Sequence, residues 1–100
     1  MNIFDFVTQD EIDELSGDAN LAFMTFVRHA EGRLAARIER LESELQEPWH
    51  SIEEAMHGFM NVVIAAARRY QIEPFASLGV PRHGDFKVDQ YHQFRADLDH

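Results

Sequence analysis

The stretch from Phe23 to Leu45 reads FMTFVRHAEGRLAARIERLESEL, and its apolar residues recur at alternating steps of three and four. The residues that share this spacing are Phe23, Val27, Ala30, Leu34, Ile38, Leu41 and Leu45. At about 100° per residue they form one narrow stripe along a helix, whereas the residues of a strand would alternate between two faces. We therefore predict a long helix over residues 18–46, with Asp18 as its N-cap.

A second apolar stripe follows Pro48. Its members, at heptad spacing, are Ile52, Met56, Phe59, Val63, Ala66 and Tyr70. This spacing predicts a second long helix over residues 51–72. Ser51 and Glu54 fit a capping box at its start, or alternatively Pro48 occupies the first helical position. Two helices joined by so short a turn predict a long antiparallel hairpin.

Shorter segments precede and follow this hairpin. We predict an N-terminal arm and a short helix over residues 1–17, and a last helix over residues 85–100 that begins at Asp85. The inner side of the last helix consists of Val88, Tyr91, Phe94 and Leu98. Its apolar periodicity still continues where the sequence ends, which predicts either a truncated helix or a last turn that frays. The chain is thus expected to be a single all-α domain over residues 1–100, a three- to four-helix bundle.

The last helix is too short to cover an apolar seam of about 40 Å. Dimerisation through the hairpin is the simplest way to cover the rest, and a purely structural self-oligomerisation module is one candidate function. The predicted self-association stripe consists of Phe23, Val27, Leu34, Ile38, Leu41, Phe59 and Val63.

The charge composition restricts the partners of this protein. The 100 residues include 18 Asp and Glu but only 9 Lys and Arg, a net charge of −9, and 13 of the acidic residues lie before residue 61. Such a chain is not expected to bind DNA or an anionic membrane surface, because both need cationic surface. The absence of Cys excludes disulfides and thiol catalysis. Since the sequence also lacks a signal peptide and a long apolar run, we expect a cytoplasmic protein.

An acidic segment surrounds the single Trp, at the turn of the predicted hairpin. Glu44, Glu47, Glu53 and Glu54 flank Trp49. A Trp at this place is either a core anchor that closes the bundle or the centre of an interface that a basic partner approaches. The second interpretation predicts a non-enzymatic protein-interaction domain. Its sharpest form is an inhibitor of a basic effector, similar in size, charge and helicity to small acidic immunity proteins.

Basic residues at the other end of the predicted hairpin suggest a complementary surface. The candidates for this basic patch are Arg68, Arg69, Arg82, His83 and Lys87. We hypothesise that the patch would accept the acidic turn of a second copy of the chain.

Two acid-x-x-His pairs have the spacing of ligands in di-iron helical bundles. The pairs are Glu54 with His57 and Asp89 with His92. Such ligands must point into the bundle, but Glu54 and His57 lie about 200° and 140° from Ile52 around the helix and therefore face away from the apolar seam. We predict solvated surface pairs, with Glu54 as a capping residue, and expect no metal or other cofactor.

The end of the chain reads Arg95-Ala96-Asp97-Leu98-Asp99-His100. An Arg followed at this spacing by a His resembles the HEPN nucleases, which implies a small dimeric helical domain that cleaves RNA with Arg95 and His100. The sequence departs from that family at Ala96, where a polar residue is usual, and it lacks a basic surface for RNA. Since no nucleophile or phosphate-binding motif is present either, we favour a non-enzymatic protein over the ribonuclease alternative.

Overall fold

The structure, a computed structural model, describes residues 18–99, which contain helices and no strand. The elements are α2 (Ala19–Glu44), α3 (Trp49–Tyr70), the 3-10 turns η2 (Phe75–Ser77) and η3 (His83–Asp85), and α4 (Val88–Leu98). The all-α prediction is confirmed, whereas the predicted arm and short helix over residues 1–17 lie outside the described residues. None of the described helices is both long and apolar enough to cross a membrane.

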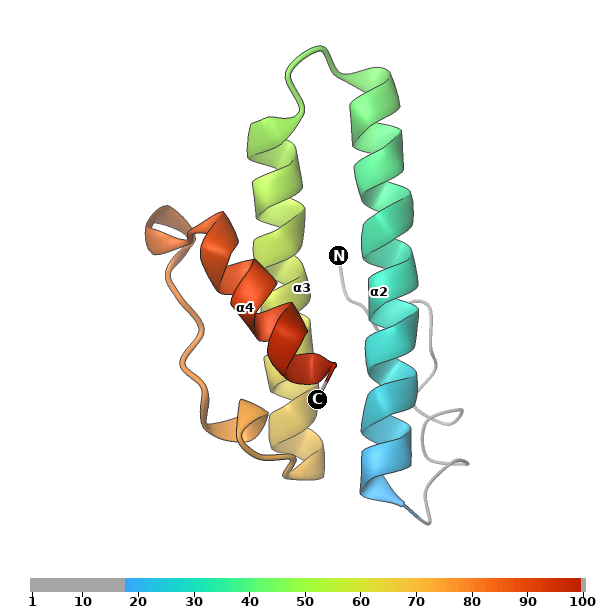
Figure 1. Cartoon of the computed structure of the whole chain (residues 1–100), viewed down its shortest axis with the longest axis vertical. Helices are drawn as coiled ribbons and strands as arrows, with labels where there is room; N and C mark the ends of the chain where they lie inside the picture. The colour runs from blue at the N-terminus through green and yellow to red at the C-terminus, as the bar shows by residue number, and fades with distance from the viewer. Residues whose placement is uncertain (1–17, 100) are drawn as a thin grey trace.

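The helix α2 begins where the sequence predicts and ends slightly earlier. The carboxylate Oδ1 of Asp18 accepts a hydrogen bond from the backbone N–H of Asn20 at 2.9 Å, which confirms Asp18 as the N-cap. The helix ends at Glu44 rather than at residue 46, because the backbone of Leu45 is extended, with φ of −113° and ψ of 142°. The turn that follows is short, and α3 returns beside α2 (Figure 1).

The start of α3 differs from the predicted capping box. Pro48 takes a helical backbone conformation, and its carbonyl oxygen accepts from the N–H of Ile52 at 2.8 Å. The helix therefore begins at Trp49, and Ser51 lies inside its first turn rather than before it. Pro48 is the N-cap residue, one position before the first helical residue that the alternative made it, and its fixed φ suits the start of a helix. The prediction that Ser51 and Glu54 cap this helix is wrong.

The start of α4 also differs from the prediction. Asp85 belongs to η3, and the helix begins three residues later, at Val88. Between them the chain is extended at Phe86, which buries this side chain to 9% exposure. The side-chain Oε1 of Gln90 then accepts from the N–H of Lys87 at 2.8 Å and closes the first turn. Burial of Phe86 thus explains the delayed start.

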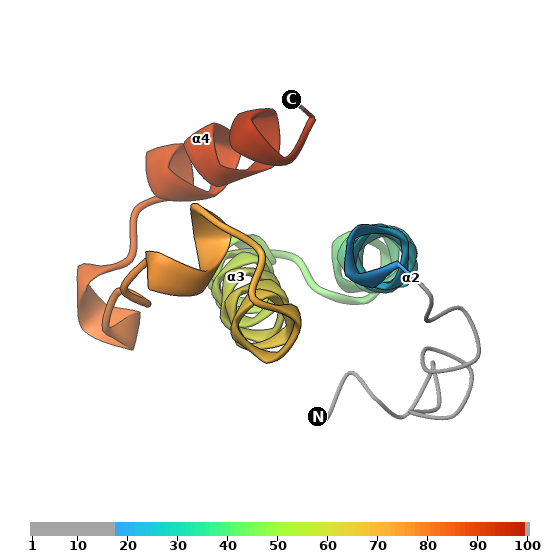
Figure 2. The same ribbon diagram turned by 90° about the horizontal axis from the view of Figure 1, so that it is seen from below.

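Aromatic side chains join α4 to the rest of the core. In the view from below, α4 lies across α3 and its C-terminal end points toward α2 (Figure 2). The ring of Phe94 meets the rings of Phe59 and Phe75 edge-on, at centroid distances of 6.3 and 5.6 Å. Phe75 in turn lies 6.1 Å from Phe23 of α2. One apolar core therefore connects α2, α3, η2 and α4.

Most of the predicted self-association stripe is buried within the single chain. Five of its seven residues are at most 6% exposed. These are Phe23, Val27, Leu34, Phe59 and Val63. Ile38 and Leu41 are only half-buried, and they belong to the part of α2 that rises above α4 (Figure 1). Among the described residues, apolar side chains are thus left partly open in the upper part of the hairpin, and also at Leu21 and Leu78, which are 51% and 36% exposed.

Candidate functional site

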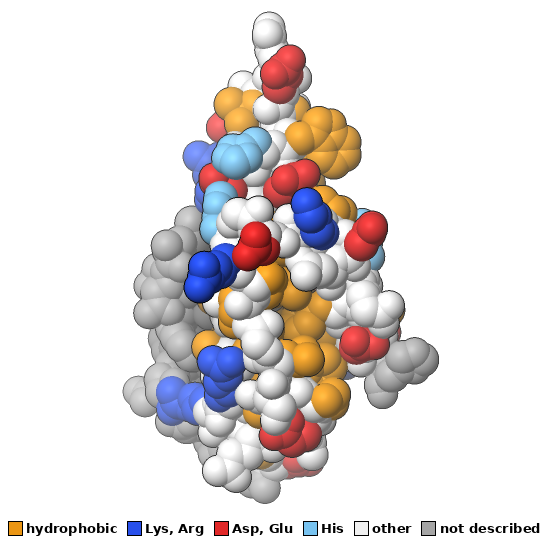
Figure 3. Space-filling view, turned by 90° about the vertical axis from the view of Figure 1, so that its left-hand side faces the viewer, with side chains coloured by type: hydrophobic (Ala, Val, Ile, Leu, Met, Phe, Trp, Pro, Cys, Tyr) orange, Lys and Arg blue, Asp and Glu red, His pale blue; other side chains and the backbone are white. Residues whose placement is uncertain are grey.

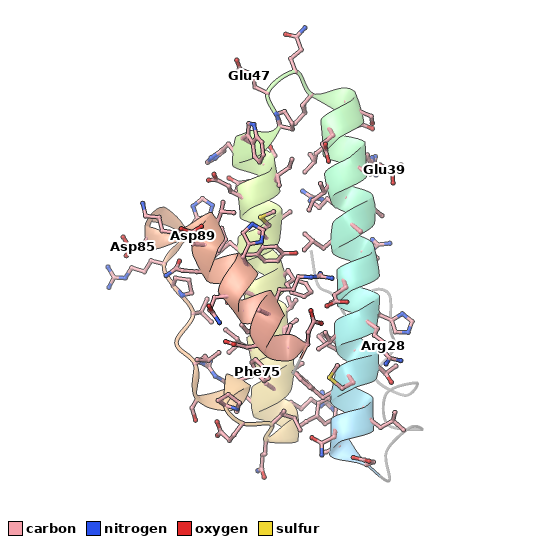
Figure 4. All side chains as sticks on the ribbon, in the orientation of Figure 1. Arg28, Glu39, Glu47, Phe75, Asp85 and Asp89 are labelled. Carbon is pink, nitrogen blue, oxygen red and sulfur yellow. The ribbon has the colours of Figure 1, made fainter. Side chains whose placement is uncertain are left out.

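The upper end of the hairpin carries four carboxylates and one Trp within residues 44–54. We call Glu44, Glu47, Trp49, Glu53 and Glu54 the acidic tip. Glu47 lies at the apex of the turn (Figure 4). The side chains of Glu44 and Glu54 are 60% and 50% exposed. Because the turn is short, the end of α2 and the start of α3 bring these charges together at one end of a molecule that measures 45 × 24 × 22 Å.

Trp49 is exposed and does not close the bundle. As the first residue of α3 it is 70% exposed, and Leu45 at the end of α2 is 43% exposed. The interpretation of Trp49 as a core anchor is wrong, because most of its side chain faces solvent rather than the core. Contiguous exposed apolar patches with a polar rim are typical of interaction sites, and Trp49 is the most exposed of the large apolar side chains in the described part of the chain.

Ion pairing neutralises little of the acidic tip. The Arg40 Nε lies 3.2 Å from Oε1 of Glu44, but both side chains are well exposed, at 76% and 60%. Such an exposed ion pair contributes about 0–1 kcal/mol to stability, so that Glu44 can pair with a basic side chain of another protein instead. The acidic tip therefore keeps a negative potential toward solvent.

Beside the acidic tip, histidines from two segments meet one of its carboxylates. We call His50, Glu54, His57 and His83 the His–Glu cluster. Oε1 of Glu54 lies 3.0 Å from Nε2 of His50 and 3.6 Å from Nε2 of His83. The ring of His83 also meets those of His50 and His57 edge-on, at centroid distances of 6.2 and 5.6 Å. Histidine and acidic side chains gather in this way near the top of the surface in Figure 3.

The position of His57 contradicts the prediction of a solvated surface residue. It is 9% exposed, and its Nε2 lies 2.7 Å from the carbonyl oxygen of Pro81. Since a carbonyl only accepts, this nitrogen carries the hydrogen. The side chain faces away from α2, as its helical position indicates, but the segment between η2 and α4 folds over it and places Phe86 5.3 Å from its ring.

The two predicted acid-x-x-His pairs do not converge. Glu54 contacts His50 and His83, and His57 is bonded to a backbone carbonyl. Asp89 and His92 are exposed on α4. Within residues 18–99, no three His, Asp or Glu side chains are placed so that they could hold a metal ion.

The predicted ribonuclease residue Arg95 forms an ion pair between two helices. Its Nη1 lies 3.6 Å from Oε1 of Glu31, so that it links α4 to α2. Burial lowers the pKa of Arg95, but a hydrogen bond with Tyr91 and the charge of Glu31 outweigh this effect and raise it. His100 lies outside the described residues, and the pairing of Arg95 with His100 stays a prediction.

The predicted basic patch is not one surface. Nε and Nη2 of Arg68 donate to the carbonyl oxygens of Ala76 and Leu78 at 3.2 and 2.9 Å, which fixes the segment around η2 against the end of α3. His83 lies instead beside Glu54, near the acidic tip. The patch hypothesis assumed that these residues lie close together. This assumption failed because the path of the chain between α3 and α4 cannot be predicted from local periodicity.

The sequence indicated the acidic tip but not the His–Glu cluster. His50 and Glu54 are four positions apart, which is the helical spacing of an interacting pair, and this signal could have been used. His83 has no such local signal, because it reaches Glu54 from a different segment.

No family model matches this sequence, and comparisons with curated proteins and with solved structures give no significant match. The function has to be inferred from the acidic tip and its surroundings.

Proposed function

We propose that this chain is a non-enzymatic interaction domain that binds a basic protein through the acidic tip. One observation carries the proposal: Trp49 is 70% exposed and is flanked by carboxylates. Trp is enriched among the residues that contribute most to protein interfaces, because it buries a large area with little loss of conformational freedom. Burial of Trp49 and the neighbouring Leu45 by a partner would remove apolar surface from water.

The charges around Trp49 indicate the chemistry of the partner. Four carboxylates attract Lys and Arg side chains and accelerate the approach of a cationic surface. A matching partner combines an apolar pocket for Trp49 with basic residues around it. The most specific form of this proposal is an inhibitor that covers the cationic surface of a basic effector.

We expect charge reversal at the acidic tip to weaken partner binding by about tenfold or more at low salt, mainly through the association rate. The variant is Glu47→Lys/Glu53→Lys. The immobilised full chain is used to capture partners from host lysate after nuclease treatment, and the association rate of the recovered protein is then measured across a salt series. The wild-type rate should fall steeply with salt, and that of the variant should change little.

The matched control is Glu39→Lys/Asp97→Lys, which changes the net charge by the same amount. Glu39 lies on the outer side of α2 (Figure 4), and Asp97 is exposed near the C-terminal end of α4. A partner whose binding depends on the acidic tip is retained by this control and is weakened by Trp49→Ala. Equal binding by the tip variant and the control would refute the proposal.

Self-association is a second candidate, favoured by the half-buried Ile38 and Leu41 above α4. A dimer formed here would join the upper parts of two hairpins. Sedimentation equilibrium of the full chain should then show a dimer that Ile38→Lys converts to a monomer without loss of helical circular dichroism. Arg37→Ala, on an exposed position of α2, serves as the control. A wild-type chain that stays monomeric at all concentrations tested would exclude the dimer.

A further inference from the structure

Two histidines, His50 and His83, lie against one carboxylate oxygen of the acidic tip, that of Glu54. We propose that protonation of His50 and His83 neutralises Glu54 and its surroundings, so that acidification weakens the binding of a basic partner. The inference rests on the proposed function, because it concerns the regulation of the same site. Histidine is the side chain that ordinarily changes charge between pH 5 and 8.

The geometry supports an imidazolium at both positions. Oε1 of Glu54 lies 3.0 Å from Nε2 of His50 and 3.6 Å from Nε2 of His83, within reach of an ion pair with each. The side chains of His50 and His83 are 78% and 58% exposed, so that a proton from solvent reaches them freely. His50 lies in the first turn of α3, where the helix dipole disfavours a positive charge, and Glu54 offsets this effect.

The environment of His57 differs from that of His50 and His83. His57 is buried, and its Nε2–H already donates to the carbonyl oxygen of Pro81 at 2.7 Å. It therefore contributes a buried donor to the cluster, whereas His50 and His83 present their rings to solvent. The proposal therefore assigns the change in charge to His50 and His83.

Other charged side chains belong to the segments around the cluster. They are Glu53 on α3, Arg82 and Asp85 beside His83, Lys87 and Asp89 at the start of α4, and Arg40, Glu42 and Glu44 near the end of α2. Two imidazolium charges would offset half of the charge of the four carboxylates in the acidic tip. The affinity for a cationic partner should fall about three- to tenfold, as expected for two exposed charges.

The test uses the full chain and a basic peptide whose own charge does not change. A short amphipathic peptide of Lys, Leu and Ala, without His and with an acetylated N-terminus, is titrated at about pH 7.5 and about pH 5.5, at constant ionic strength and with a chelator present. Fluorescence of Trp49, the single Trp of the chain, reports binding directly at the acidic tip. The variant is His50→Gln/His83→Gln, and the control is His29→Gln, which removes an exposed histidine of α2.

We expect weaker binding at the lower pH for the wild type and for His29→Gln, and a change of less than about twofold for His50→Gln/His83→Gln. Binding that is equal at both pH values, or a pH dependence that survives in the double variant, would overturn this inference and leave the proposed function intact. Absence of binding at both pH values would overturn the inference together with the preference of the acidic tip for basic partners.

Discussion

Replacement of Phe94 by alanine is expected to lower the free energy of unfolding by about 3–5 kcal/mol. The side chain is 3% exposed and lies between the rings of Phe59 and Phe75, at 6.3 and 5.6 Å. Its loss leaves a cavity where α4, α3 and η2 meet. A domain of this size is stable by about 5–15 kcal/mol, so that the variant should unfold at a much lower urea concentration.

Two further variants make this expectation specific to the packing of α4. Phe94→Leu keeps most of the apolar volume and should cost only about 1–2 kcal/mol. Gln93→Ala, at the adjacent exposed position, removes a solvent-facing hydrogen bond to Asp97 and should change stability by less than about 0.5 kcal/mol. If Phe94→Ala cost no more than Gln93→Ala, the position of α4 against α3 would be wrong.

The two long helices could be predicted from the sequence because their signals are local. Apolar residues at steps of three and four determine which side of a helix is buried, and Phe23, Val27 and Val63 are buried as that pattern requires. The N-cap role of Asp18 depends only on the N–H groups of the next turn. The acidic tip could be anticipated for the same reason, since all of its residues lie within residues 44–54.

Features that depend on segments far apart in the sequence could not be predicted in this way. The helical position of His57 shows that it faces away from α2, but not that the segment between η2 and α4 covers it. Arg95 and Glu31 likewise meet only because α4 turns back toward α2. Trp49 had two interpretations, and its exposure of 70%, which depends on how the chain folds around it, excludes the core anchor. In each case the environment of the side chain depends on residues that are distant in the sequence, and the local sequence pattern does not contain this information.

Replacement of His57 by alanine is expected to cost about 2–3 kcal/mol and to free the segment between η2 and α4. The substitution removes the donor at 2.7 Å from the Pro81 carbonyl and the ring that packs against Phe86. Arg82 and Lys87, in this segment, are the two basic residues of the chain that lie outside α2, α3 and α4. Under native conditions trypsin should therefore cut His57→Ala at these two residues first, about tenfold or more faster than the wild type.

The matched pair of variants for this prediction is His57→Gln and His57→Leu. Glutamine keeps an N–H donor for the Pro81 carbonyl, whereas leucine keeps apolar volume but leaves that oxygen without its partner. If the hydrogen bond holds the segment in place, Gln should restore resistance to trypsin better than Leu does. Equal cleavage of both variants would assign the effect to packing against Phe86 instead. A cleavage rate of His57→Ala equal to that of the wild type would show that neither contact holds the segment, and that His83 reaches Glu54 without the support of His57.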